Sequence, residues 1–145
     1  MRILALDIGD KRTGVAISDP SGKVATPLTV LATSQQSRHD SELAKLVEDY
    51  EVESILVGLP LTMEGVPGPQ ARHIQALADK MARFLRVPVH YVDERLSSAE
   101  AAKRMRESGE TERSMRGRLD MVAAAVFLQA YLDMQERCGS EGNDR

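Results

Sequence analysis

Hydrophobic residues gather in short runs near the start of the chain. Residues 2–8 form one apolar run, residues 14–19 repeat the pattern, and residues 23–31 follow the turn signal Asp-Pro-Ser-Gly. The links between these runs are too short for a crossover helix, so we expect an antiparallel meander of three strands. Pro27 in the third run lacks a main-chain donor, which predicts that this strand lies at an edge of the sheet.

From residue 40 onward, helical and strand patterns alternate. The predicted elements are a helix over 40–50, a strand over 54–60, a helix over 70–85, a strand over 87–94, and helices over 97–108 and 119–137. This alternation predicts later strands parallel to the first and a mixed five-stranded α/β sheet flanked by helices. We expect a single domain over residues 1–137, a mobile loop over 109–118 and a disordered polar tail over 138–145.

The composition excludes several classes of protein. No apolar run reaches the roughly 20 residues that a membrane span needs, so we expect a cytoplasmic protein with no membrane partner. The single cysteine excludes an internal disulfide and a cysteine-based zinc cluster. A formal net charge of -3 argues against indiscriminate coating of nucleic acid, which depends on Lys and Arg.

Charge is unevenly distributed along the chain. Segment 40–53 holds six acidic residues against Lys45 alone, whereas 71–86 holds four basic residues against one acid, and 95–118 holds seven against four. One explanation of these charged segments is that they are helix faces exposed to solvent. The alternative is that the basic segments contact a polyanion.

Asp7 stands where an apolar residue would be expected. It continues the alternation of Ile3 and Ala5 on a strand inside the sheet, so it lies at the strand's carboxyl end, where open α/β sheets bind ligands. Two interpretations remain open: a functional carboxylate, or an Asp that caps the turn at Gly9.

Glu94 ends a later strand that we expect to run parallel to the strand of Asp7. Both carboxylates should therefore emerge at the same edge of the sheet. Asp93 faces the other way by strand alternation, and we interpret it as a turn residue or a partner of Arg95.

Asp120 lies in the first turn of the most apolar helix, on the face of Ala123, Ala124 and Phe127. The helix dipole favours an acid at this position, which is one explanation for it. Alternatively, the alanines let the helix approach the sheet closely, which would bring Asp120 toward the strand ends.

Three carboxylates at one edge, without Cys or paired His, form an oxygen site suited to Mg²⁺ or Mn²⁺. Two such ions can clamp the attacking and leaving oxygens in phosphodiester hydrolysis. Basic residues nearby are then candidate contacts for substrate phosphates, although surface solvation also accounts for each of them. The candidate contacts are Lys11, Arg12, Arg72 and Arg95.

Four blocks of the chain, in this order, resemble the YqgF/RuvX family of Holliday junction resolvase-like proteins, which are also described as pre-16S rRNA nucleases. The blocks are LALDIGDKRTGVAISD, ILVGLPLTMEGVPGPQA, VDERLSSAEA and LDMVAAAVFLQAYL, and they span nearly all of the chain from residue 1 to about residue 134. The chain departs from the family at Thr62 and Glu64, often Asn and Asp in members, and at Val66-Pro67, often a polar-acidic pair.

The resemblance implies an RNase H-like fold with an acidic metal site on Asp7, Glu94 and Asp120. In that fold the strand over 54–60 lies between the strands of Asp7 and Glu94, which places their backbones roughly 10 Å apart. A long Glu side chain and bridging ions can span this distance. Gly58 in the middle strand is then expected to keep the space clear.

The implied function is metal-dependent cleavage of structured RNA at an end of pre-16S rRNA, by a monomer or a homodimer. One alternative is a resolvase of branched DNA, whose symmetry would suit a homodimer. A second is a non-catalytic RNA-binding assembly factor on the same fold. The motif DIGDKRTG also suggests an ATP-dependent kinase, which the length disfavours because that fold needs a second lobe.

Overall fold

The computed structural model describes residues 2–36, 41–61, 64–94 and 121–135. Its sheet has five strands in the order β3-β2-β1-β4-β5. The strands are β1 (Ile3–Ile8), β2 (Arg12–Ser18), β3 (Ala25–Ala32), β4 (Ser54–Leu59) and β5 (Val89–Asp93). The helices are the 3₁₀ turn η1 (Thr33–Gln35), α1 (Glu42–Asp49) and α2 (Pro69–Leu85), and residues 121–135 are also helical.

The predicted strand directions are confirmed. β1 pairs with β2 and β2 with β3 in antiparallel fashion, while β4 runs parallel to β1 and β5 parallel to β4. β3 lies at the edge of the sheet, as Pro27 predicted, and the β2–β3 register shifts between Val15 and Ala16, where Ala16 faces Pro27. Pro27, which has no main-chain N–H to donate, therefore lies at a bulge on an outer strand.

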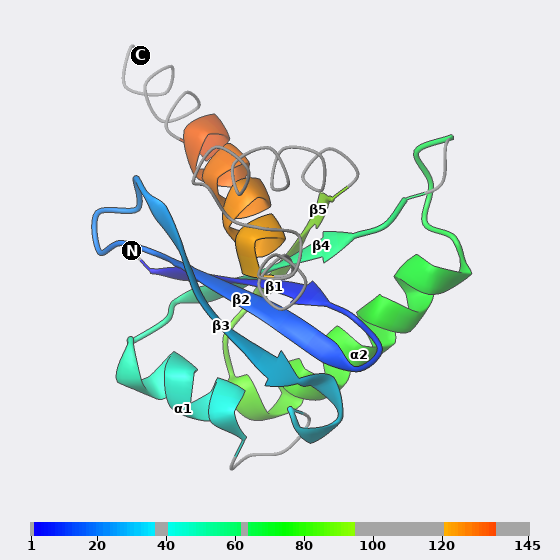
Figure 1. Cartoon of the computed structure of the whole chain (residues 1–145), viewed down its shortest axis with the longest axis horizontal. Coiled ribbons are helices and arrows are strands. Elements are labelled where there is room, and N and C mark those ends of the chain that lie inside the picture. The colour runs from blue at the N-terminus through cyan, green and yellow to red at the C-terminus, as the bar shows by residue number, and fades with distance from the viewer. Residues whose placement is uncertain (1, 37–40, 62–63, 95–120, 136–145) are drawn as a thin grey trace, which may run out of the picture.

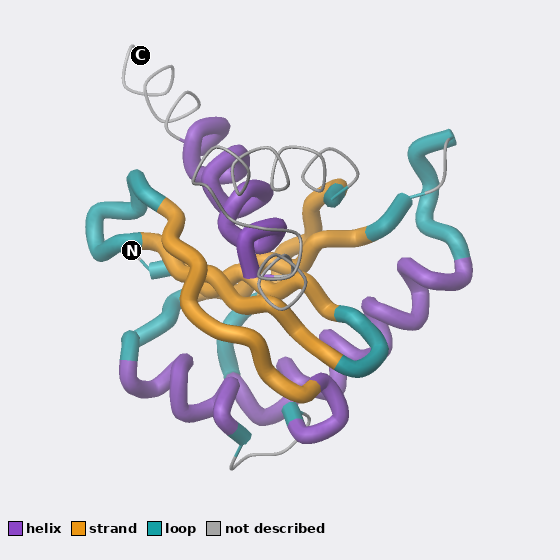
Figure 2. Tube along the Cα trace, viewed as in Figure 1, coloured by secondary structure: helices purple, strands orange, loops and turns teal. Residues whose placement is uncertain are grey.

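Two helical layers cover the two faces of the sheet (Figures 1 and 2). Helices α1 and α2 pack on one face, in a cluster that includes Leu4, Leu6 and Ile8 of β1. The helix over 121–135, orange to red in Figure 1, packs on the other face against Ile3 and Ala5. Strand alternation thus divides β1 between two cores, and it directs Asp7 to the face of the helix over 121–135.

Small residues line the contact between that helix and the sheet. Ala124 is fully buried and Ala125 nearly so, and they share a cluster with Ala5 and Ala16 of the central strands. Because an alanine side chain ends at Cβ, helix and sheet can approach closely here. The close approach predicted from the alanine-rich sequence is confirmed for these residues.

Three elements begin two residues later than predicted, β3 at Ala25, α1 at Glu42 and β5 at Val89, whereas β2 begins earlier. This strand begins at Arg12, two residues earlier than predicted, because Thr13 is fully buried and pairs with Leu31 of β3. The 3₁₀ turn η1 was not predicted. Helix α2 begins at Pro69, whose fixed φ angle suits a first helical position, one residue before the predicted start.

The β2–β3 hairpin turns where the sequence predicted, over residues 19–22. The carboxylate of Asp19 accepts hydrogen bonds from the Ser21 hydroxyl and from the main-chain N–H groups of Val24 and Lys23, at 3.0 and 2.8 Å. These donors hold the pKa of Asp19 well below its usual range, with the Ser21 bond the largest cause. Gly22 has a φ of 74°, a conformation that glycine adopts without strain.

Several predicted features lie outside the described residues: the helix over 97–108, the loop over 109–118, the tail over 138–145, and the side chains of Arg95 and Asp120. Within the described residues, no helix is both long and apolar enough to span a lipid bilayer.

Candidate active site

Asp7 lies near the carboxyl end of β1, half-buried, on the face covered by the helix over 121–135. Its partner in β2 is Gly14. On the other side, β1 and β4 pair up to Leu6 and Val57, so the next residue of β4 beside Asp7 is Gly58. Asp7 is therefore flanked by glycine on both neighbouring strands, so no side chain from either neighbouring position stands beside its carboxylate. The role of Gly14 was missed in the sequence, although a glycine at the start of an apolar run was its signal.

Gly58 lies directly beside Glu94, as the sequence predicted. A Cβ atom at Gly58 would come within 3.0 Å of Glu94 Oε2 and 3.1 Å of Glu94 Cβ. It would also come within 2.8 Å of Cε2 of Phe127, from the helix over 121–135. Any side chain at this position would therefore displace Glu94 or Phe127.

Glu94 follows β5 and continues its pairing, since its main-chain N–H donates to the carbonyl of Leu59 at 3.1 Å. It is half-buried, whereas the preceding Asp93 is exposed and, by strand alternation, directs its side chain to the opposite face of the sheet. The structure thus brings Asp7 and Glu94 to the same edge and the same face of the sheet, with β4 between them. Among the described residues, no group of three His, Cys, Asp or Glu side chains could hold a metal ion. Asp120, the predicted third ligand, precedes the described helix.

The turn between β1 and β2 is held tightly just beyond Asp7. The N–H of Gly9 donates to the carbonyl of Arg12 at 2.8 Å, and a Cβ at Gly9 would lie 2.8 Å from that same oxygen. Only glycine permits this close approach of the two backbone segments. Gly9 is thus a turn residue, while the carboxylate of Asp7 remains on the strand.

Two buried threonines, Thr13 of β2 and Thr33 of η1, fix this turn to the segment after β3, and they were missed by the sequence analysis. The Thr33 hydroxyl donates to the Gly9 carbonyl at 2.7 Å, so in its 2.8 Å contact with the Thr13 hydroxyl it acts as the acceptor. The Thr33 N–H donates to the carbonyl of Lys11 at 3.0 Å. Isolated threonines in a sequence carry no signal for such pairing, because the partners are twenty residues apart.

Three of the four predicted phosphate contacts lie near this edge. Lys11 and Arg12 are exposed on the turn after Asp7, and Arg72 is exposed near the start of α2. A contact of 3.4 Å between Asp10 Oδ1 and His73 Nε2 joins the turn to α2, so these cations belong to one stretch of surface. Arg95 lies outside the described residues.

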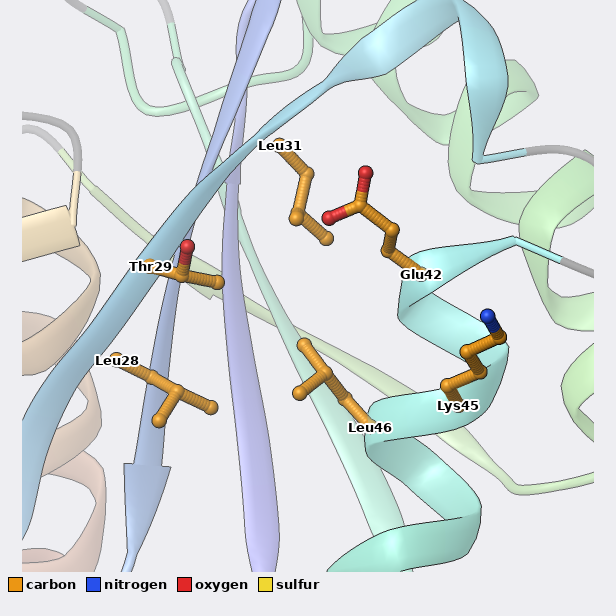
Figure 3. Close-up of a pocket in the computed structure, with 6 residues that line it drawn as sticks. All are labelled: Leu28, Thr29, Leu31, Glu42, Lys45 and Leu46. Atoms are coloured by element: carbon orange, nitrogen blue, oxygen red, sulfur yellow. The ribbon is translucent and has the colours of Figure 1, made fainter.

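Two hollows of about 310 Å³ each lie elsewhere among the described residues. One lies between β3 and α1, where Leu28, Leu31 and Leu46 face one another and Glu42 and Lys45 stand at the rim (Figure 3). The other lies between β5 and the helix over 121–135, and is lined by Val92, Asp93, Phe127, Ala130, Tyr131 and Met134. Neither hollow contains a predicted site residue.

Comparison with known proteins agrees with this arrangement. The sequence model of the RuvX family, described as Holliday junction resolvase, matches residues 1–134. A protein of Roseiflexus sp. (strain RS-1) is 40% identical over 134 residues, which cover 92% of this chain and 95% of that relative. A protein of Anaeromyxobacter sp. (strain Fw109-5) is 44% identical over 133 residues, covering 92% and 97%. Both relatives carry the name "Putative pre-16S rRNA nuclease".

Solved structures with a similar fold share little sequence. Thermus thermophilus RuvC in complex with a Holliday junction substrate superimposes with a TM-score of 0.57 at 14% identity, over 94% of this chain and 96% of RuvC. Fowlpox virus resolvase in complex with Holliday junction DNA gives a TM-score of 0.58 at 14% identity, over 93% and 99%. This likeness confirms the RNase H-like fold. Because its family model matches almost the whole described chain and relatives exceed 40% identity, the chain belongs to the RuvX family.

Proposed function

We propose that this chain is a metal-dependent nuclease that hydrolyses phosphodiester bonds at an end of the small-subunit ribosomal RNA precursor, in the cytoplasm. The names of its relatives support the substrate. The observation that carries the chemistry is the placement of Asp7 and Glu94 at one edge and one face of the sheet, with Gly58 between them. Both carboxylates are half-buried and lie at the carboxyl ends of parallel strands, where open α/β sheets bind ligands.

The donor set fits a hard divalent cation. Asp7 and Glu94 offer only oxygen, and neither Gly14 nor Gly58 puts a side chain beside Asp7. We assign the cation, Mg²⁺ or Mn²⁺, to Asp7, Glu94 and Asp120. When bound, it supplies activation of water and neutralisation of phosphate charge.

The other residues of the edge bind and orient the substrate. In this proposal Lys11, Arg12, Arg72 and Arg95 contact substrate phosphates. The hydrogen bonds from Thr33 to Gly9 and Lys11 hold the turn in place before substrate arrives. A turn that is already ordered loses little conformational entropy on binding.

The test measures cleavage of precursor RNA in Mg²⁺ by variants of three carboxylates. Asp7→Asn and Glu94→Gln should each lower cleavage by at least 100-fold, in the range seen for loss of an electrostatic catalytic group. Asp93→Asn is the matched control, because Asp93 is the carboxylate next to Glu94 in sequence and its side chain lies on the opposite face of the sheet. Binding of RNA by Asp7→Asn should persist. Equal cleavage by all three variants and the wild type would refute the assignment.

The description of the family model favours a second substrate, the four-way DNA junction. The same variants tested on a junction would distinguish the two, because a resolvase should cut the junction and leave precursor RNA intact. Such an enzyme should also be a homodimer, since a junction offers two equivalent strands. Cleavage of neither substrate, with RNA binding retained, would identify a non-catalytic assembly factor.

A further inference from the structure

Basic side chains form a stripe along the outer face of α2. Arg72, Ala76, Lys80 and Arg83 are all exposed, and their spacing of four, four and three residues places them on one side of the helix. The stripe extends about 16 Å along the axis. Three cations thus follow one line, with a small residue between the first two.

Helix stability accounts for only part of this stripe. Arg83 lies in the last turn, where the helix dipole favours a cation. Arg72 lies near the opposite end, where the dipole disfavours one, and the first turn holds no acid to compensate. Lys80 lies between, where the dipole has little effect. The charge at Arg72 is therefore better explained by a ligand than by the helix.

Neighbouring acids do not neutralise the stripe. Within the described part of the chain, no ion pair involves Arg72, Lys80 or Arg83. Asp79, the one acid of α2, accepts a long hydrogen bond of 3.5 Å from the Tyr91 hydroxyl. Burial raises the pKa of Tyr91, and the charge of Asp79 raises it further, so this hydroxyl keeps its proton.

An exposed aromatic ring accompanies the cations. Phe84 follows Lys80 by one helical turn and is 45% exposed, whereas Phe127, the other phenylalanine of the chain, is 4% exposed. Leaving a phenylalanine in water forgoes the free energy that its burial would provide. Aromatic rings among Lys and Arg side chains are typical of surfaces that bind single-stranded nucleic acid, since every base has a face to stack.

The stripe begins at the same edge of the sheet as the candidate active site, although α2 packs on the face opposite to Asp7 and Glu94. The contact between Asp10 and His73 places the β1–β2 turn beside the start of α2, next to Arg72. The exposed side of α1, which covers the same face of the sheet, carries the acids Glu48 and Asp49. A polyanion leaving the site is therefore attracted along α2 and repelled by α1.

We propose that α2 binds a single-stranded flank of the nucleic-acid substrate, with phosphates on Arg72, Lys80 and Arg83 and a base stacked on Phe84. This inference rests on the proposed function, because it takes a nucleic acid as the substrate. It adds that the protein recognises unpaired nucleotides beyond the bond that it cleaves.

The test measures binding without cleavage. In the Asp7→Asn background, affinities are compared for an RNA hairpin with a blunt end and the same hairpin with a single-stranded extension. Lys80→Gln/Arg83→Gln should abolish the gain in affinity from the extension and reduce the salt slope by about 1.4, or 0.7 for each lost contact. Phe84→Ala should lower affinity for the extended RNA about fivefold or more.

Each variant has a matched control on another element. Lys45→Gln removes a cation from α1, and Met134→Ala truncates an apolar side chain that is 61% exposed. Neither should change the gain from the extension. Thermal unfolding confirms that each variant is folded, and a DNA hairpin of the same sequence shows whether the surface prefers RNA.

The outcomes separate this inference from the proposed function. If the α2 variants behave like their controls, or weaken blunt and extended hairpins equally, α2 is not a single-strand site. If the parent protein binds neither hairpin, the inference is likewise overturned. The nuclease assignment is tested separately, by cleavage assays on protein in which Asp7 and Glu94 are unchanged.

Discussion

Gly58 is packed so closely that a larger residue cannot fit without movement. We expect Gly58→Ala to destabilise the protein by about 1–3 kcal/mol, the usual cost of overpacking a core, and to weaken Mg²⁺ binding because the new methyl group displaces Glu94. Urea unfolding and calorimetric titration with Mg²⁺ measure the two effects.

A second substitution separates the two contacts of that methyl group. Phe127→Leu in the Gly58→Ala background should recover part of the lost stability, because it removes the ring carbon 2.8 Å away, yet leave Mg²⁺ binding weak. Phe127→Leu alone completes the cycle. Unchanged Mg²⁺ affinity in Gly58→Ala would mean that Glu94 does not hold the ion.

Asp19 makes the free energy of unfolding depend on pH under acidic conditions. Its pKa is lowered in the folded state, so its contribution to stability is present above the unfolded value of about 3.9 and is lost as pH falls below it. The difference in unfolding free energy between wild type and Asp19→Ala should therefore be constant above about pH 5 and shrink below about pH 4.

The cause of that shift can be checked directly. Ser21→Ala removes the largest contribution, so the pKa of the Asp19 carboxyl, followed by NMR, should rise toward its usual range. If the pKa stayed where it is in the wild type, the Val24 and Lys23 amides alone would account for the shift.

At the scale of elements, Gln129 joins the helix over 121–135 to the β2–β3 hairpin. Its Oε1 accepts from the Ala25 N–H at 2.9 Å, and its Nε2 donates to the Lys23 carbonyl at 2.9 Å and to Asp133 at 3.1 Å. Gln129→Ala should cost about 1–3 kcal/mol, because it leaves main-chain groups without partners.

Asp133→Ala is the control for this link, since it removes only the exposed third bond and should cost less than about 1 kcal/mol. Hydrogen exchange at the Ala25 amide provides a local measure. Equal protection of that amide in Gln129→Ala and the wild type would contradict the role of the side chain.

The elements also show which features a sequence pattern can reveal. Pro27 marked the edge strand and Gly58 the space beside Glu94, because each follows from a backbone property of one residue. The start of β2 was predicted wrongly, because burial of polar Thr13 depends on a hydroxyl from Thr33, in the 3₁₀ turn η1 that follows β3. The polar contact between Asp10 and His73 likewise joins two elements, which periodicity does not predict.

At the scale of the whole molecule, the antiparallel meander followed from connection lengths and the common edge of Asp7 and Glu94 from strand direction, whereas the place of β4 between β1 and β5 was implied by the family resemblance. These rules are general, so they hold without knowledge of any side-chain contact. The assignment of Asp120 and Arg95 stays a prediction, since both lie outside the described residues. The single domain over 1–137 is a prediction in the same sense.

The strand order also bears on when the protein becomes active as it is made. β1, β2 and β3 pair with close neighbours in sequence and can form early, whereas the carboxylate of Glu94 arrives only once β5 has paired with β4. In the proposed site, a chain still emerging from the ribosome therefore carries only Asp7 of the three carboxylates. We expect no cleavage before Glu94 and Asp120 have been added, so that a nascent copy would not cut the RNA around it.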